Sequence, residues 1–171
     1  MFNKNIKIVL AVLTLIWSGF HFYKGNYGYG VLILLLTALI VFLYFKNEYI
    51  LMSFLRLQKQ DFAGATKWLD KIKNIETALV VKQQGYYNFL RGILISQTSL
   101  TKAEKFFKKA LKLGLSMDHD VSMAKLQLAG IAITKRRKME ATRLLSEAKK
   151  LDKRGMLKDQ IKQLKDQLKR I

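Results

Sequence analysis

The chain has 171 residues, of which 50% are hydrophobic, and a formal net charge of +19 at pH 7. It has no cysteine, which excludes disulfides and Cys-ligated metal sites, and no proline, as expected of a mostly helical chain. All 12 acidic residues lie at Glu48 or later, whereas only three of the 31 lysines and arginines precede residue 46. The chain is therefore predicted to divide into an apolar part, residues 1–46, and a basic part, residues 47–171.

Two apolar runs, at about residues 6–23 and 28–45, predict transmembrane helices. Each is long enough, at about 1.5 Å per residue, to cross most of a hydrocarbon core about 30 Å thick. The glycine-rich segment between them, KGNYGYG, predicts a turn and hence a two-helix hairpin. A cleaved signal peptide is the alternative, although WSGFHFYK at the end of the first run lacks a small-residue cleavage site.

The basic residues predict the orientation of this hairpin. Lys4 and Lys7 precede or begin the first run, only Lys24 lies in the turn, and the other 28 follow the second run. Lysine and arginine accumulate on the cytoplasmic side of membrane proteins. We therefore expect an integral protein of a bacterial-type inner membrane with both termini in the cytoplasm.

Two smaller features of the apolar part carry expectations of their own. No proline or glycine interrupts FLYFKNEYILMSFLRLQ, so one nearly continuous helix is expected from about Gly30 to Leu57. His21, near the outer end of the first run, is expected to be structural and to have a backbone partner. A proton relay would need a second ionisable group at membrane depth, and Lys7 can extend to the interface instead.

The basic part contains an internal repeat. Segments that begin at Asp61, Ser99 and Arg137 align without gaps, 38 residues apart. Each has a small residue, a large one four positions later, and a small or medium one three positions after that, which describes one face of a helix. These positions are Ala65, Ala103 and Ala141, then Leu69, Phe107 and Leu145, then Ile72, Ala110 and Ala148. An apolar helix precedes each segment, so stacked helical hairpins are predicted.

This pattern resembles the tetratricopeptide repeat (TPR) family, best in the middle unit, where Tyr87, Leu90 and Leu94 precede Ala103, Phe107 and Ala110. The resemblance implies three repeats, at about residues 47–74, 83–113 and 121–151, that stack into an all-α solenoid. The chain departs from the family in its period, which is usually about 34, in its lack of proline, and at Arg56, Arg91 and Lys125. A Sel1-like or other helical-hairpin repeat is the alternative.

The last segment, residues 155–171, has an apolar stripe on a polar helix, formed by Leu157, Ile161, Leu164, Leu168 and Ile171. As a capping helix it would cover the open end of the third repeat, which is the favoured interpretation. As a coiled-coil strand it would dimerise the chain, but two heptads are short for that. A homo-oligomer is thus a second, less favoured outcome.

The sequence contains few candidates for a catalytic, metal-binding or phosphate-binding site. Around His119, the stretch MDHD predicts a helix N-cap at Asp118 or Asp120 rather than a metal site. No glycine-rich phosphate loop and no Ser, His and acid combination with a plausible setting is found. The chain is therefore predicted to be no enzyme and to use no metal or cofactor.

The positive charge has three interpretations. Lys102, Lys105, Lys109 and Lys112 recur opposite the apolar side of their helix, and Arg136 and Arg137 lie in the turn of the third unit. These six could face solvent, anionic lipid or an acidic protein, since a lysine near an acidic leaflet is worth about 1 kcal/mol. Nucleic acid is disfavoured because no nucleic-acid module or exposed stacking aromatics accompany the charge.

The TPR resemblance implies a binding function, with a groove lined mainly by the first helix of each unit. On that basis Gln84, Asn88, Arg91 and Lys125 are candidate contacts for a protein or peptide. The predicted function is a membrane-anchored adaptor or scaffold on the cytoplasmic face of the inner membrane. The alternatives are a structural subunit of a membrane complex and a solenoid that faces the periplasm.

Overall fold

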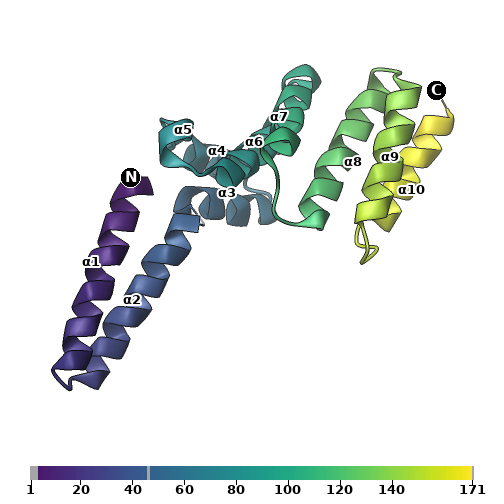
Figure 1. Ribbon diagram of the computed structural model, residues 1–171. Coiled ribbons are helices and arrows are strands. Elements are labelled where there is room, and N and C mark those ends of the chain that lie inside the picture. The colour runs from purple at the N-terminus through teal and green to yellow at the C-terminus, as the bar shows by residue number, and fades with distance from the viewer. Residues whose placement is uncertain (1–3, 46, 171) are drawn as a thin grey trace. The chain divides into compact units, whose positions relative to one another are not determined.

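The computed structural model describes residues 4–45 and 47–170 (Figure 1). In these residues it forms ten α-helices and no strand, which confirms the all-α prediction. The helices are α1 (Lys4–Tyr23), α2 (Tyr27–Phe45), α3 (Glu48–Gln58), α4 (Phe62–Asp70), α5 (Ile75–Ala78), α6 (Val81–Ile95), α7 (Leu100–Leu113), α8 (Asp118–Thr134), α9 (Lys138–Leu151) and α10 (Lys158–Lys169).

The chain forms two compact units, Met1–Gln83 and Gln84–Ile171. This boundary differs from the one expected at residues 46 and 47, because the first helical pair of the basic part belongs with the apolar hairpin. Lys7 Nζ of α1 lies 2.7 Å from Glu48 Oε2 of α3, which ties the pair to the hairpin. Gln83, in the first turn of α6 and still in the first unit, donates a 2.9 Å hydrogen bond to the Tyr44 carbonyl of α2.

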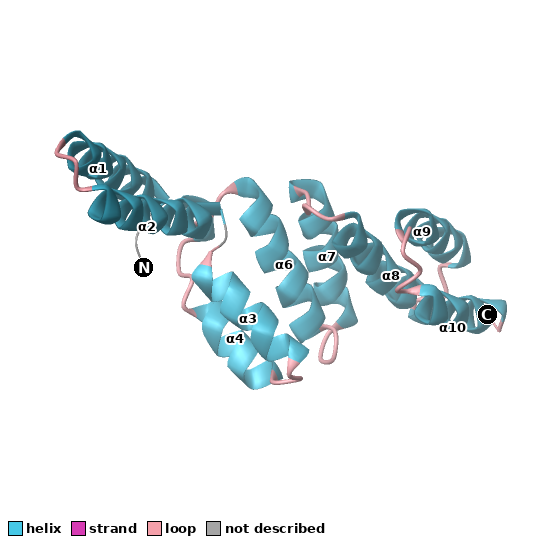
Figure 2. Ribbon diagram, turned by 90° about the horizontal axis from the view of Figure 1, so that it is seen from below, coloured by secondary structure: helices cyan, strands magenta, loops and turns pink. Residues whose placement is uncertain are grey.

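In the first unit, α1 and α2 pack side by side as an antiparallel hairpin (Figure 2). The chain reverses at Gly25, whose φ of 76° lies in the left-handed region that glycine adopts freely. The Asn26 amide closes the turn with a 3.0 Å hydrogen bond to the His21 carbonyl. A turn thus forms in the expected segment, but it takes only residues 24–26, because the other four residues of KGNYGYG begin α2.

The continuous helix expected from Gly30 to Leu57 is wrong. Lys46 lies outside the described residues, but Asn47 has an extended backbone (φ −64°, ψ 129°) and N-caps α3. Its side-chain oxygen accepts a 3.0 Å hydrogen bond from the Tyr49 amide. Asparagine is among the best N-cap residues, so a local side-chain bond ends the run of helical backbone between α2 and α3.

The repeat positions lie in the core of both units. All nine side chains that align at 38-residue spacing are buried, each at most 4% exposed: Ala65, Leu69, Ile72, Ala103, Phe107, Ala110, Ala141, Leu145 and Ala148. In the preceding helices Leu90 and Leu128 are also buried, but their counterpart Met52 is 42% exposed. The register therefore describes the second helix of each pair better than the first helix of the first pair.

Two of the helical pairs share one turn geometry. The turn from α3 to α4 places Gln60 at φ 59°, and the turn from α8 to α9 places Arg136, two repeat periods later, at φ 56°. In both turns the next amide, of Asp61 or Arg137, bonds a carbonyl five residues back. This is the bonding of a left-handed helix C-cap, and it occurs here at equivalent positions.

The second unit is built on α7 to α10, with the C-terminal part of α6. Phe89 of α6 meets Phe107 of α7 edge-on, with ring centroids 6.1 Å apart. α8 packs against α7 and α9, and α10 packs against α8 and α9. Leu157 and Ile161 of the apolar stripe are buried there, Leu164 and Leu168 are partly exposed, and Ile171 lies outside the described residues. That this helix caps a solenoid stays a prediction.

Gly92 and Gly130, which correspond in the repeat, give a matched test of this packing. A Cβ at Gly92 would lie 2.7–2.9 Å from the Phe107 ring, whereas one at Gly130 would meet only Leu164 Cδ2 at 3.8 Å. We expect Gly92→Ala to destabilise the second unit by about 1–3 kcal/mol through overpacking. Gly130→Ala should stabilise it by about 0.5–1 kcal/mol, the helix-propensity gain.

The measurement is thermal unfolding of the full chain in detergent, followed by circular dichroism at a helical wavelength. An unchanged midpoint for Gly92→Ala would show that α6 and α7 are not in the close contact described here.

Candidate functional site

The α1–α2 hairpin reverses the usual distribution of polar and apolar side chains. Its outward surface carries large apolar residues that are 39–66% exposed, among them Leu13, Ile16, Leu32, Leu35 and Leu39. Its inward surface buries hydroxyl groups instead, with Ser18 at 1% and Thr37 at 6% exposure. A water-soluble hairpin would place these two kinds of side chain the other way round.

The buried hydroxyls join the two helices. Ser18 Oγ donates a 2.8 Å hydrogen bond to the Gly30 carbonyl. Thr37 Oγ1 donates to Thr14 Oγ1 at 2.9 Å, and Thr14 Oγ1 donates in turn to the Leu10 carbonyl of its own helix. Hydroxyls and small residues at a helix–helix contact are typical of helices that pack in lipid, where each such bond is worth about 0.6 kcal/mol.

By length and composition, one described helix could cross a membrane, over Ile6–Tyr23, and only 6% of it is buried within the chain. The apolar stretch of α2, Tyr27–Phe42, is shorter. α1 has 20 residues and α2 has 19, so at about 1.5 Å per residue both approach the thickness of a hydrocarbon core.

Aromatic rings gather at the turn end of the hairpin. The His21 ring lies 6.0–6.3 Å from the rings of Trp17, Phe20 and Tyr29. The expected backbone partner of His21 is not found at Nδ1, which is buried without a hydrogen bond. Amphipathic rings concentrate at membrane interfaces, and these occupy one end of the apolar surface.

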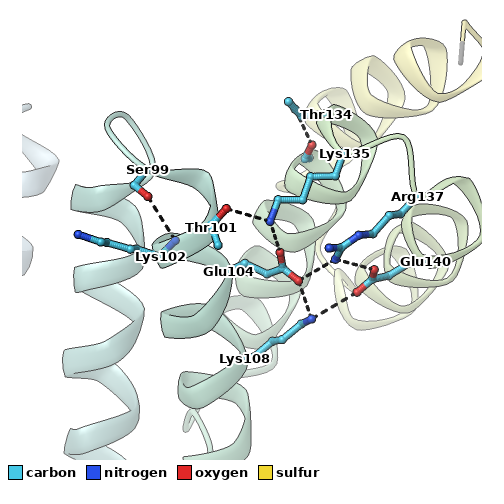
Figure 3. A network of polar contacts seen from close by, with 10 residues as sticks. Ser99, Thr101, Lys102, Glu104, Lys108, Thr134, Lys135, Arg137 and Glu140 are labelled. Carbon is cyan, nitrogen blue, oxygen red and sulfur yellow. Dashed lines mark hydrogen bonds and ion pairs between the residues drawn. The ribbon is translucent and has the colours of Figure 1, made fainter.

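In the second unit, one acidic side chain forms ion pairs with three basic ones (Figure 3). Glu104 of α7 is 9% exposed and bonds Lys108 at 2.6 Å, Lys135 at 2.7 Å and Arg137 at 2.9 Å. Glu140 of α9 joins through Arg137 at 3.4 Å and Lys108 at 3.7 Å. The cluster therefore links α7 to the turn between α8 and α9.

The geometry lowers the pKa of Glu104. The hydrogen bonds from Lys108 and Lys135 stabilise its carboxylate most, burial opposes them, and Arg137 adds to them. Together they lower the pKa from the usual 4.5 to about 2. Glu104 therefore stays charged at any physiological pH and acts as a fixed anion in a basic unit.

The remaining positive charge of this unit is concentrated on its surface. Residues 84–171 contain 21 basic and 8 acidic residues, a formal excess of 13. Among the described residues, ion pairs with carboxylates are formed by Lys108, Lys125, Lys135, Arg137, Arg143, Lys153 and Lys169. Within the described part of the chain, Lys102, Lys105, Lys109, Lys112 and Arg136 are exposed and have no such partner.

Of the six basic residues predicted to meet lipid or an acidic protein, five are exposed without a carboxylate partner among the described residues, and one is paired. Lys102, Lys105, Lys109 and Lys112 form an exposed stripe on α7, and Figure 3 shows Lys102 pointing away from the Glu104 cluster. Arg136 is exposed at the turn, whereas Arg137 is held by Glu104 and Glu140. We call the four α7 lysines the α7 stripe.

The four predicted groove residues make contacts within the chain. Asn88 is buried and donates to the Gln84 carbonyl at 2.7 Å. Arg91 donates to the Tyr87 hydroxyl at 3.0 Å, and Lys125 of α8 pairs with Glu147 of α9. That they contact a partner stays a prediction.

The expected N-cap at Asp118 or Asp120 is wrong, because the N-cap of α8 is Met117 and no side chain bonds there. Asp118 pairs instead with Lys153 at 2.9 Å, and Asp120 accepts a 2.6 Å hydrogen bond from the Tyr86 hydroxyl. Burial and this bond raise the pKa of Tyr86 to about 12. Among the described residues no group of three or more His, Cys, Asp or Glu is placed to hold a metal.

Sequence reasoning missed Ser18, Thr37 and Glu104. A local signal existed for the first two, because hydroxyls inside an apolar run are expected to face a neighbouring helix. For Glu104 the only local signal is its i,i+4 pair with Lys108, since its other partners Lys135 and Arg137 lie more than 30 residues away.

Comparisons with protein-family models, curated proteins and solved structures give no match for this chain. The TPR resemblance therefore depends on the repeat residues alone, and it stays a hypothesis.

Glu104 makes the stability of the second unit depend on pH. Because its pKa is lower in the folded chain, its contribution is complete above about pH 4.5 and is lost as the pH falls towards 2. We expect Glu104→Gln to lower the free energy of unfolding by about 1–3 kcal/mol at pH 7. It should also reduce the loss of stability that the unchanged chain shows as the pH falls below 4.5. Urea unfolding of the full chain in detergent at pH 7, 4 and 3 measures both.

The control is Glu76→Gln, because Glu76 of α5 is exposed. Glu76→Gln should change neither the free energy of unfolding at pH 7 nor its dependence on pH. An equal effect of the two substitutions would contradict the role given to the Glu104 cluster.

Proposed function

We propose that the chain is a membrane-anchored adaptor: the α1–α2 hairpin spans a bacterial inner membrane, and the TPR-like helical pairs bind a protein on the cytoplasmic side. The observation that carries this proposal is the reversed hairpin, which buries Ser18 and Thr37 and exposes its leucines and isoleucines. Apolar patches of that extent are rare on soluble monomers, and lipid would cover them without cost.

The contacts between α1 and α2 favour an anchor over a cleaved signal peptide. Removal of α1 would leave Thr37 and the Gly30 carbonyl of α2 without their partners in α1. It would also remove Lys7 from Glu48. A segment that is to be discarded has no need of such contacts, whereas a permanent hairpin depends on them.

The adaptor function is supported by the repeat. The buried register positions and the shared turn geometry are what stacked helical pairs require, and such stacks present extended binding surfaces. The excess of 13 positive charges in residues 84–171 favours an acidic segment of the partner or an anionic leaflet as the counterpart.

Leu35, in the middle of α2 and 66% exposed, tests the anchor. Arginine at the centre of a transmembrane helix costs about 2.5–3.5 kcal/mol, so Leu35→Arg should lower the fraction of protein that resists alkaline carbonate extraction. The control is Met139→Arg, which places the same group at an 88% exposed position of α9 and should change nothing. If Leu35→Arg instead resisted carbonate extraction as fully as the unchanged chain, Leu35 would not lie in a hydrocarbon core and the anchor would be contradicted.

The lack of cysteine allows the orientation to be tested with single introduced thiols. We expect Asn26→Cys, in the turn, to react with a membrane-impermeant maleimide in intact cells. Gln163→Cys, exposed on α10, should react only after permeabilisation. The opposite pattern would place the helical pairs in the periplasm.

An assembly subunit is separated from an adaptor by where protein cross-links form. A photoreactive residue at Gln84 should capture a protein if the helical pairs bind the partner. One at Leu13, outward on α1 and 57% exposed, should then capture lipid only. Protein captured at Leu13 and not at Gln84 would favour the assembly subunit.

A further inference from the structure

Like the hairpin, the helix that follows it exposes large apolar side chains and buries a polar one. Four large apolar side chains of α3, those of Leu51, Met52, Phe54 and Leu55, are each 40–43% exposed. Ser53 on the opposite side is completely buried, and its hydroxyl has no hydrogen-bond partner. α3 thus buries its serine against the first unit and turns its apolar side chains outward.

The first unit holds α3 at one end of the hairpin. Glu48, its first residue, pairs with Lys7 in the first turn of α1, and Asn47, two residues after the end of α2, caps it. In Figures 1 and 2, α3 runs across this end of the hairpin rather than in line with α2. The end is the one opposite the turn and its aromatic rings.

The charge and aromatic content around α3 suit the boundary between lipid headgroups and acyl chains. Its one acidic residue, Glu48, is neutralised by Lys7. Next to it, Tyr49 of α3 stacks on Trp68 of α4 with ring centroids 5.9 Å apart, and Lys71 Nζ lies 3.8 Å from the Trp68 ring centroid. Tyrosine, tryptophan and lysine are the side chains that concentrate at this depth.

We infer that α3 is an interfacial helix, whose outward face of Leu51, Met52, Phe54 and Leu55 inserts into the headgroup region of the membrane that holds the hairpin. This inference rests on the proposed anchor, because the hairpin brings α3 to that depth. Helices of this kind lie in the plane of the membrane with the apolar face buried about 5–10 Å into the boundary between headgroups and acyl chains. The break at Asn47 allows this orientation, which a continuous helix would exclude.

The consequence is a fixed placement of the first helical pair. α4 packs on α3 within the first unit, so insertion of α3 holds this pair against the bilayer surface instead of leaving it on a tether. The chain would then contact the membrane through three helices, two that cross it and one that lies on it.

Depth-dependent quenching in the full chain tests the inference. Single cysteines at Leu35 in α2, Leu55 in α3 and Gln163 in α10 are labelled with an environment-sensitive fluorophore. The protein is then reconstituted in vesicles that contain anionic lipid, with bromine atoms either near the headgroup or deep in the acyl chains. All three positions are exposed or partly exposed, and the first two are matched Leu→Cys changes.

We expect the label at Leu35 to be quenched most by deep bromines, the label at Leu55 most by shallow bromines, and the label at Gln163 by neither. If Leu35 is quenched and Leu55 reports water, α3 is not interfacial while the anchor stands. If Leu55 reports a dry environment that lipid bromines do not quench, a protein surface covers α3 and the inference is overturned. If the label at Leu35 is not quenched, the hairpin does not lie in the bilayer. The proposed anchor is then wrong, and the interfacial position of α3 loses its basis.

Discussion

The packing of α1 on α2 through hydroxyl groups is the constraint on which the first unit depends. Ser18 bonds a backbone carbonyl of α2 and Thr37 bonds Thr14, so the polar groups of two apolar helices are satisfied between the helices. Most of the large apolar side chains are then directed outward, although Ile33 is buried. Exposed apolar surface of this extent marks a membrane or protein contact, and it is the observation behind the proposed membrane anchor.

The second unit must fold despite repulsion among its positive charges, since it has 21 basic and only 8 acidic residues. Some of its acidic residues lie at contacts between helices: Glu104 joins α7 to the turn before α9, and Glu147 holds Lys125 across the α8–α9 pair. The α7 stripe is left exposed and without carboxylate partners among the described residues. Cations that stabilise the fold are thereby separated from cations that are available to an anionic surface.

Local patterns predicted much of this architecture. The helical class, the turn at Gly25 and the buried face of α4, α7 and α9 follow from composition and from spacings that depend only on helix geometry. The break at Asn47 was overlooked although asparagine is a preferred N-cap, because the apolar residues around it suggested a continuous helix. Asp118 and Asp120, in the first turn of α8, led to the opposite error, since both have longer-range partners instead of capping the helix end.

The sequence by itself thus determined that the chain is helical, that its first part is apolar and its second basic, and which side chains of the repeated helices are buried. Tertiary structure alone decided that Arg137 and Lys125 are held by Glu104 and Glu147, and that α3 turns its apolar face outward. The reason is physical: helix periodicity acts within four residues, whereas these ion pairs join residues 22 to 33 apart, and an exposed face depends on what packs behind it.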